Sequence, residues 1–152
     1  GGGMFVYNSG DVSLEGASFS ECTATAKNGG GMVVVNSGDV SGASFSECTA
    51  SDDGGGLFVE SSGDVSLERA NFSECTATAK GGGGMLVWKS GNVSVSVKGA
   101  SFVRCTASYF GGGMSVFMRL PAPNSRRAEE VCSCGRAATS RWTAPASAIA
   151  RL

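Results

Sequence analysis

The chain has 152 residues, with 24 glycines, three prolines, six cysteines and no histidine, and its formal net charge is −1. The length fits one domain. The lack of histidine excludes mechanisms that use an imidazole, and the near-neutral charge gives no general attraction to nucleic acid or to an anionic membrane. The longest apolar run, Met32–Val35, is far too short to cross a bilayer, so no membrane-spanning segment is expected.

A repeat organises most of the sequence. Each unit opens with a glycine run and then a large apolar residue, at Met4, Met32, Leu57, Met85 and Met114, so the units are 28, 25, 28 and 29 residues apart. Within a unit the order is constant: an apolar segment, Ser-Gly-Asp or Ser-Gly-Asn, Val-Ser, Ala-x-Phe, and x-x-Cys-Thr-Ala. Self-similarity at such a period is typical of solenoid proteins, in which stacked units bury a shared core.

The units vary in length mainly in one place, and in steps of two residues. From the turn glycine (Gly10, Gly38, Gly63, Gly91) to the phenylalanine, the spacing is nine, seven, nine and eleven residues. A β-strand tolerates such steps because its side chains alternate with a period of two, whereas a helix would be rotated. We therefore expect an all-β fold, a single-stranded parallel β-helix of about four full turns and part of a fifth. Crossover chirality favours right-handed winding. The glycine runs are expected to act as flexible loops.

Alternation assigns an inward face to each strand of a unit. In the first strand the methionine or leucine and the valine two residues later face inward. The second strand aligns Val12 and Leu14 with Val40, with Val65 and Leu67, and with Val93, Val95 and Val97, leaving Ser13, Ser41, Ser66 and Ser94 in water. A corner is expected near Gly16, Gly42, Arg69 and Gly99. An interior phenylalanine row follows, made of Phe19, Phe45, Phe72 and Phe102. The last strand places cysteine and alanine inside and threonine outside.

The composition changes after residue 118, which predicts a repeat domain over 1–118 and a basic tail over 119–152. The first part has six basic and 11 acidic residues, and the tail has six basic and two acidic residues. The tail contains all three prolines, and residues 128–138 can form a short helix, although disorder or a capping role fits equally well. Because the repeat stops without an obvious cap, we expect a fragment of a longer repeat protein whose neighbouring units continue the stack.

The motif F-x-x-C-T-A followed by GGG-[ML]-x-V resembles the repeats of chlamydial-type polymorphic outer-membrane proteins, with their GGA-[ILV] and F-x-x-N motifs. More broadly, residues 1 to about 118 are similar to the pectin-lyase-like right-handed β-helix superfamily. The resemblance implies an adhesin-like or scaffold role at a cell surface. The catalytic members carry acidic and basic site residues for which no counterparts are identified here.

The asparagine position of that motif is occupied by Cys22, Cys48, Cys75 and Cys105, so the asparagine ladder that the resemblance implies becomes a cysteine ladder. Neighbouring turns lie within the distance that a disulfide spans, which makes Cys22–Cys48 and Cys75–Cys105 conceivable pairs. Stacked buried thiols are the favoured alternative, because cysteine packs as a small hydrophobe. Without histidine, a zinc site is not expected, and no other metal site or cofactor is predicted.

Three polar features each have a functional and a structural interpretation. The row Asp11, Asp39, Asp64 and Asn92 can bind calcium, but it also fits turn chemistry. Hydroxyl rows (Thr23, Thr25, Thr49, Ser51, Thr76, Thr78, Thr106, Ser108) resemble those of ice-binding proteins, but they also fit β propensity. Asn71 and Asn92 lie in glycosylation sequons, which suits a secreted protein.

The outward side of the first strand is unusually apolar. It carries Phe5, Val33, Phe58, Leu86 and Ser115 in one row and Tyr7, Val35, Glu60, Trp88 and Met118 in the next. We take Phe5, Tyr7, Phe58 and Trp88 as a candidate binding face for a protein or glycan partner. The alternative is that the tail or a sister module covers this face.

Repetition without a unique polar cluster predicts a non-catalytic, extracellular or cell-surface β-solenoid that acts as an adhesin-like scaffold. The alternatives are a carbohydrate-active β-helix enzyme or glycan-binding module, similar to polysaccharide lyases, and an ice-binding solenoid. An enzyme would need positioned acids or bases in one cleft.

Overall fold

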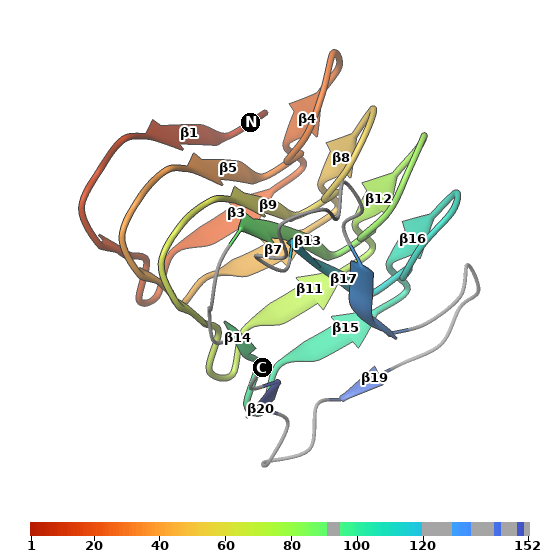
Figure 1. Ribbon diagram of the computed structural model, residues 1–152. Helices are drawn as coiled ribbons and strands as arrows, with labels where there is room; N and C mark the ends of the chain where they lie inside the picture. Colours follow the sequence, from red (N-terminus) through yellow and green to blue (C-terminus); the bar gives the residue numbers. More distant parts are fainter. Residues whose placement is uncertain (91–94, 120–128, 135–141, 144–148, 151–152) are drawn as a thin grey trace.

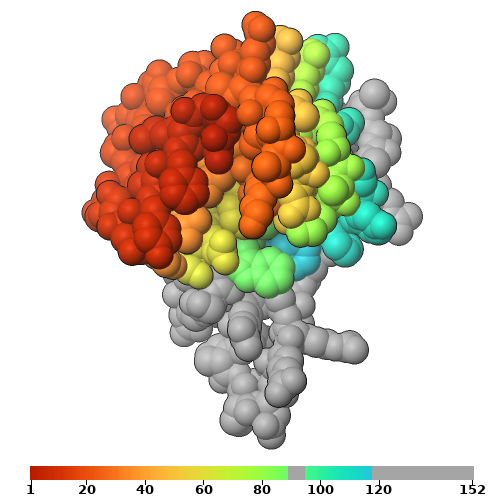
Figure 2. Space-filling view, turned by 90° about the horizontal axis from the view of Figure 1, so that it is seen from above, coloured from red at the N-terminus to blue at the C-terminus, as the bar shows by residue number. Residues whose placement is uncertain are grey.

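The protein is a parallel β-solenoid. The computed structural model describes residues 1–90, 95–119, 129–134, 142–143 and 149–150, and this part of the chain contains no helix. The chain winds through four turns of four short strands each, and β17 begins a fifth turn (Figure 1). Figure 2 shows the turns as successive bands of colour lying side by side. The architecture expected from the repeat is confirmed.

Equivalent strands of successive turns form four sheets. The first sheet is β1 (Met4–Tyr7), β5 (Met32–Val35), β9 (Leu57–Glu60), β13 (Met85–Ser90), β17 (Met114–Arg119) and β18 (Glu129–Cys134). The second is β2 (Val12–Ser13), β6 (Val40–Ser41), β10 (Val65–Ser66), β14 (Val95–Ser96) and β20 (Ile149–Ala150). The third is β3 (Ser18–Ser20), β7 (Ser44–Ser46), β11 (Asn71–Ser73), β15 (Ser101–Val103) and β19 (Trp142–Thr143). The fourth is β4 (Thr23–Ala24), β8 (Thr49–Ala50), β12 (Thr76–Ala77) and β16 (Thr106–Ala107).

Pairing between turns is parallel and places like residues over one another. Met32 pairs with Met4 and Leu57, and Phe72 pairs with Phe45 and Phe102. Within the tail, β18, β19 and β20 pair antiparallel with β17, β15 and β14. A strand at residues 129–134 replaces the short helix considered for that segment.

The interior is built from the rows that alternation predicted. The phenylalanine row stacks face to face, with ring centroids 5.1, 5.0 and 4.7 Å apart from Phe19 to Phe102. Phe45, Phe72 and Phe102 are fully buried beside the methionines and valines of the first sheet. Burying each such ring contributes roughly 1.5–3 kcal/mol, so this row is the main aromatic part of the core.

The glycine runs are close-packed parts of the wall, so the expectation that they act as flexible loops is wrong. A Cβ added to Gly55 would overlap the Gly83 carbonyl oxygen and lie 2.5 Å from the Thr76 nitrogen. A Cβ on Gly84 would lie 2.7 Å from the Phe102 ring. Glycine is required there because backbone packs directly on backbone and on the phenylalanine row.

The corners of each turn are marked by left-handed backbone. The corner expected near Gly16 is present in all four turns, with φ of 75° at Gly16, 51° at Gly42, 55° at Arg69 and 68° at Gly99. Two further corners are present. One follows the first strand, two residues before the expected turn glycine (Asn8, Asn36, Ser61), and the other, which was not expected, precedes each cysteine (Glu21, Glu47, Glu74, Arg104).

The register of the second sheet shows that one member of the predicted serine row was wrong. Val65 pairs with Val95 and Ser66 with Ser96, so Ser96 rather than Ser94 continues the serine row. The two extra residues of turn 4 precede β14, and Val93 and Ser94 lie outside the described residues. Ser13 is exposed, but Ser41 and Ser66 are half-buried.

Candidate binding surface

The outward face of the first sheet does not form one aromatic surface. Phe5 and Tyr7 are exposed and stack on each other with centroids 6.4 Å apart. Phe58, by contrast, is only 5% exposed and packs with Val33 and Leu86 in a second apolar cluster, so it cannot contact a partner as predicted. The cause is local. The glycine run that precedes β9 packs against the Phe58 side chain. A Cβ on Gly54 would lie 3.0 Å from the Phe58 Cβ.

The next outward row remains accessible. In the observed register it runs Tyr7, Val35, Glu60, Trp88 and Phe117, and we call it the outer row. Phe117, not Met118, pairs with Trp88, because alternation continues without a bulge through β13 and β17. Trp88 is 40% exposed, while Glu60 and Phe117 are half-buried.

Trp88 belongs to an aromatic cluster that the sequence did not reveal. The cluster consists of Trp88, Phe117, Phe110 and Tyr109. Phe117 lies 5.5 Å from Trp88 and 5.7 Å from Phe110, and Phe110 lies 6.3 Å from Tyr109, measured between ring centroids. Tyr109 is 75% and Phe110 46% exposed. Tyr109 and Phe110 sit in a loop, where no strand alternation signals their direction.

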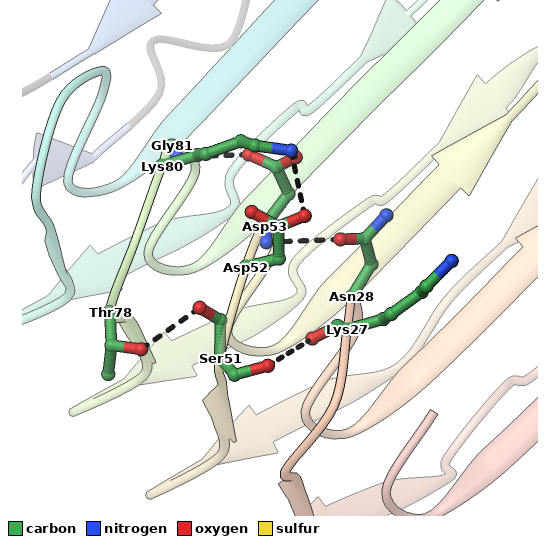
Figure 3. A network of polar contacts seen from close by, with 8 residues as sticks. All are labelled: Lys27, Asn28, Ser51, Asp52, Asp53, Thr78, Lys80 and Gly81. Carbon is green, nitrogen blue, oxygen red and sulfur yellow. Dashed lines mark hydrogen bonds and ion pairs between the residues drawn. The ribbon is translucent and has the colours of Figure 1, made fainter.

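That loop is the last member of a ridge formed by the loops that follow β4, β8, β12 and β16 (Figure 1). In Figure 3 the Asp53 backbone N–H donates to Asn28 Oδ1 at 3.2 Å, and the Gly81 N–H donates to Asp53 Oδ1 at 3.0 Å. The Tyr109 N–H then donates to the Lys80 carbonyl at 2.8 Å. These bonds fix one loop on the next, so the exposed tip of turn 4 rests on an ordered support.

Three charged side chains at the centre of the ridge form an ion-paired group. Lys80 Nζ lies 2.7 Å from Asp52 Oδ2 and 3.7 Å from Asp53 Oδ2. The hydrogen bond that Lys80 donates to Asp52 is the main cause that raises the pKa of Lys80. Burial raises the pKa of Asp53, although its hydrogen bond from Gly81 and the Lys80 charge oppose that shift. The ridge therefore carries little free charge at its centre.

A groove of about 650 Å³ lies at the corner between the second and third sheets. Its lining includes Glu15 from turn 1, Gly42 from turn 2, and Glu68 from turn 3. The short spacing of turn 2 explains the groove. Turn 1 reads Val-Ser-Leu-Glu-Gly-Ala and turn 2 reads Val-Ser-Gly-Ala, so two residues that protrude elsewhere are missing.

The cysteine row is placed in consecutive turns as four free thiols. Cys48, Cys75 and Cys105 are buried and Cys22 is half-buried at the first turn. Cys75 Sγ lies 3.6 Å from the Phe45 carbonyl and 3.4 Å from the Ser73 carbonyl. Hydrogen bonds with Cys105 and Cys48, together with burial, raise the pKa of Cys75. Burial is also the main cause that raises the pKa of Cys22. Packing and S–H···O contacts thus account for the row.

The acidic row is used by the backbone. Asp11 Oδ1 accepts the Asp39 N–H at 3.0 Å, and Asp39 Oδ1 accepts the Asp64 N–H at 2.8 Å. Asn92 lies outside the described residues. Among the residues that the structure describes, no three Cys, Asp or Glu side chains are grouped to hold a metal ion.

The hydroxyl rows and the sequon are likewise engaged. Thr76 Oγ1 lies 3.1 Å from Thr106 Oγ1 on adjacent strands. Thr78 lies beyond β12, and its hydroxyl donates to the Ser51 carbonyl at 3.1 Å. Asn71 is exposed, and its Oδ1 accepts the Ser101 hydroxyl at 2.6 Å. Only the first of the two hydroxyl rows therefore lies on strands.

The structure also bears on membrane insertion. Within the described ranges, there is no helix with the length and apolar character needed to span a bilayer.

Comparison with known proteins identifies the family. Residues 1–107 match the family described as "Right handed beta helix region". Neither a search of curated proteins nor one of solved structures gives a match. The handedness of that family agrees with the winding expected from crossover chirality. Since the match covers well over half of the 152 residues, the chain belongs to the right-handed β-helix family.

Proposed function

We propose that this chain is a non-catalytic interaction module that binds a partner protein through the aromatic cluster. One observation carries the proposal: Trp88, Phe110 and Tyr109 remain exposed in one cluster joined through Phe117, and the other exposed large apolar side chains of the described residues all lie in the first turn. Aromatic residues held on a rigid support are typical anchors of protein interfaces. The hydrogen-bonded ridge beneath Tyr109 supplies such a support.

The arrangement of charge supports a binding role over a catalytic one. Acidic side chains of the described turns recur in columns, such as Glu21, Glu47 and Glu74, which Arg104 ends by pairing with Glu74. Asp52 and Asp53 are paired with Lys80. A repeated column tiles a surface, whereas general acid–base catalysis requires a specific pair that departs from the repeat.

The resemblance of F-x-x-C-T-A and GGG-[ML]-x-V to the repeats of polymorphic outer-membrane proteins supports an adhesin-like role of this module at a cell surface. Stacked turns then serve as a rigid scaffold that presents the cluster. Further turns of a longer chain would extend the scaffold.

A peptide-display selection against the immobilised chain tests the proposal, with a glycan array run in parallel. Enriched peptides are expected to bind the wild type at least tenfold more tightly than Trp88→Ala or Phe110→Ala, because anchor residues typically contribute more than about 1.4 kcal/mol. Phe5→Ala is the matched control, since it removes a ring that is even more exposed, at 61%, from the first turn outside the cluster.

Thermal unfolding of each variant establishes that the fold is intact. If glycans but not peptides bind through Trp88, the proposed protein-binding role would be wrong and a glycan-binding role would replace it. Equal binding by wild type, Trp88→Ala and Phe110→Ala would reject the aromatic cluster as the site.

A further inference from the structure

Glu60 is out of place in the outer row. Its neighbours in register are Val35 and Trp88, and the side chain is half-buried. Over the residues that the structure describes, the carboxylate has neither an ion pair nor a side-chain hydrogen bond. Its negative charge is therefore free to pair with a cationic group of a partner. Three other acids of the described turns, Asp52, Asp53 and Glu74, have cationic partners within the chain.

Trp88 lies between Phe117 and Glu60 in the outer row. The rings of Phe117 and Trp88 are in contact and tilted by 30° to each other. Glu60 precedes Trp88 in the adjacent strand, about 4.8 Å away along the stack. Phe117 and Glu60 therefore flank Trp88 from opposite sides along the sheet.

We propose that Glu60 and Trp88 together form a pocket for an arginine side chain of the partner protein, which deepens and rests on the binding role proposed for the aromatic cluster. The guanidinium stacks on the indole on the side of Glu60, and its N–H groups donate to the Glu60 carboxylate. No covalent step is involved.

Arginine fits this pair better than other cations. Its guanidinium is planar, stacks on aromatic rings and presents a donor fork that matches a carboxylate. Lysine offers a compact, strongly hydrated charge that satisfies Glu60 but covers the indole less well. The apolar flanks, Val35 on one side and Phe117 with Phe110 on the other, favour an arginine between apolar residues.

Tryptophan fluorescence measures this directly. The chain has two tryptophans, so Trp142→Phe leaves Trp88 as the only reporter. The probes are acetyl-Leu-Arg-Leu-amide and the same peptide with lysine or citrulline, the uncharged isostere of arginine. We expect a saturable change with arginine, about fivefold weaker binding with lysine and at least tenfold weaker binding with citrulline.

Variants in the same background separate charge from stacking. Glu60→Gln should weaken the arginine peptide about fivefold and leave the citrulline peptide unchanged, because an ion pair of this exposure is worth about that factor. Glu15→Gln, a carboxylate in the corner groove, is the matched control and should change nothing. Thermal unfolding is recorded for both variants.

Equal affinity for arginine and citrulline, or no effect of Glu60→Gln on the arginine peptide, would overturn the arginine pocket. Peptides selected by display would still bind through the aromatic cluster in that case. Stronger binding of choline than of the arginine peptide would also overturn it and assign the pocket to quaternary ammonium groups. Loss of all peptide binding to wild type and Trp88→Ala alike would instead remove the proposed function itself.

Discussion

The inside and the outside of the first sheet follow opposite rules. Inward rows repeat apolar residues of similar size, as with Met32, Leu57 and Met85, and these three are completely buried. The outer row changes at every turn, from Tyr7 to a valine, a carboxylate and then two aromatics. Interior side chains of neighbouring turns must pack closely at a fixed spacing, so they need to be similar in size and polarity. Side chains on the outer surface of the sheet are not under this constraint. We therefore expect partner binding to involve the outer row, where the residue type is not repeated.

The largest expected effect on stability comes from a substitution in the interior phenylalanine row. Phe72→Ala should lower the free energy of unfolding by about 3–5 kcal/mol, because it removes a fully buried ring from the middle of the phenylalanine row. Phe5→Ala should cost less than about 1 kcal/mol, since that ring is 61% exposed. Urea unfolding followed by circular dichroism measures both. Similar losses for the two variants would contradict the division between inside and outside.

The sequence was sufficient for the inside. Alternation, the step of two and the glycine positions placed Phe45, Phe72 and the Gly16 corner correctly, because buried rows and left-handed backbone restrict residue choice. The same logic failed outside. Phe58 has the alternation of an exposed residue, yet the glycine-rich entry to its strand packs beside it.

The aromatic cluster and the corner groove were beyond sequence reasoning for a different reason. Tyr109 and Phe110 lie in a loop, and their contact with Phe117 depends on how the ridge stacks in three dimensions. The short turn 2 was visible in the spacing, but its consequence, a groove between the protruding Glu15 and Glu68, follows only from neighbouring turns that keep their two extra residues.

The smallest expected effect on stability concerns Asp53, a carboxyl of the ridge. Burial raises the pKa of Asp53, so the folded state favours the protonated carboxyl more than the unfolded state does. Its contribution to stability is fully present below a pH of about 4 and is lost as the pH rises through the raised pKa. Asp53→Asn keeps the oxygen that accepts the Gly81 N–H and removes this titration.

Urea unfolding between a pH of about 3 and 7 should therefore show wild type losing stability relative to Asp53→Asn, by less than about 1 kcal/mol. Parallel stability curves for the two proteins would show that the ridge does not bury this carboxyl in solution.

The variation of turn length in steps of two residues offers the most direct test that equivalent residues stack in register from turn to turn. Inserting Leu-Glu between Ser41 and Gly42 gives turn 2 the spacing of turn 1, which fills the corner groove and keeps every side chain on its face. Inserting leucine alone puts the Val40 and Phe45 rows out of phase. Thermal unfolding should leave the two-residue insertion near the wild-type midpoint and lower the one-residue insertion by more than about 8 °C, since a loss of at least about 2 kcal/mol is expected. Equal losses from both insertions would contradict turns stacked in register.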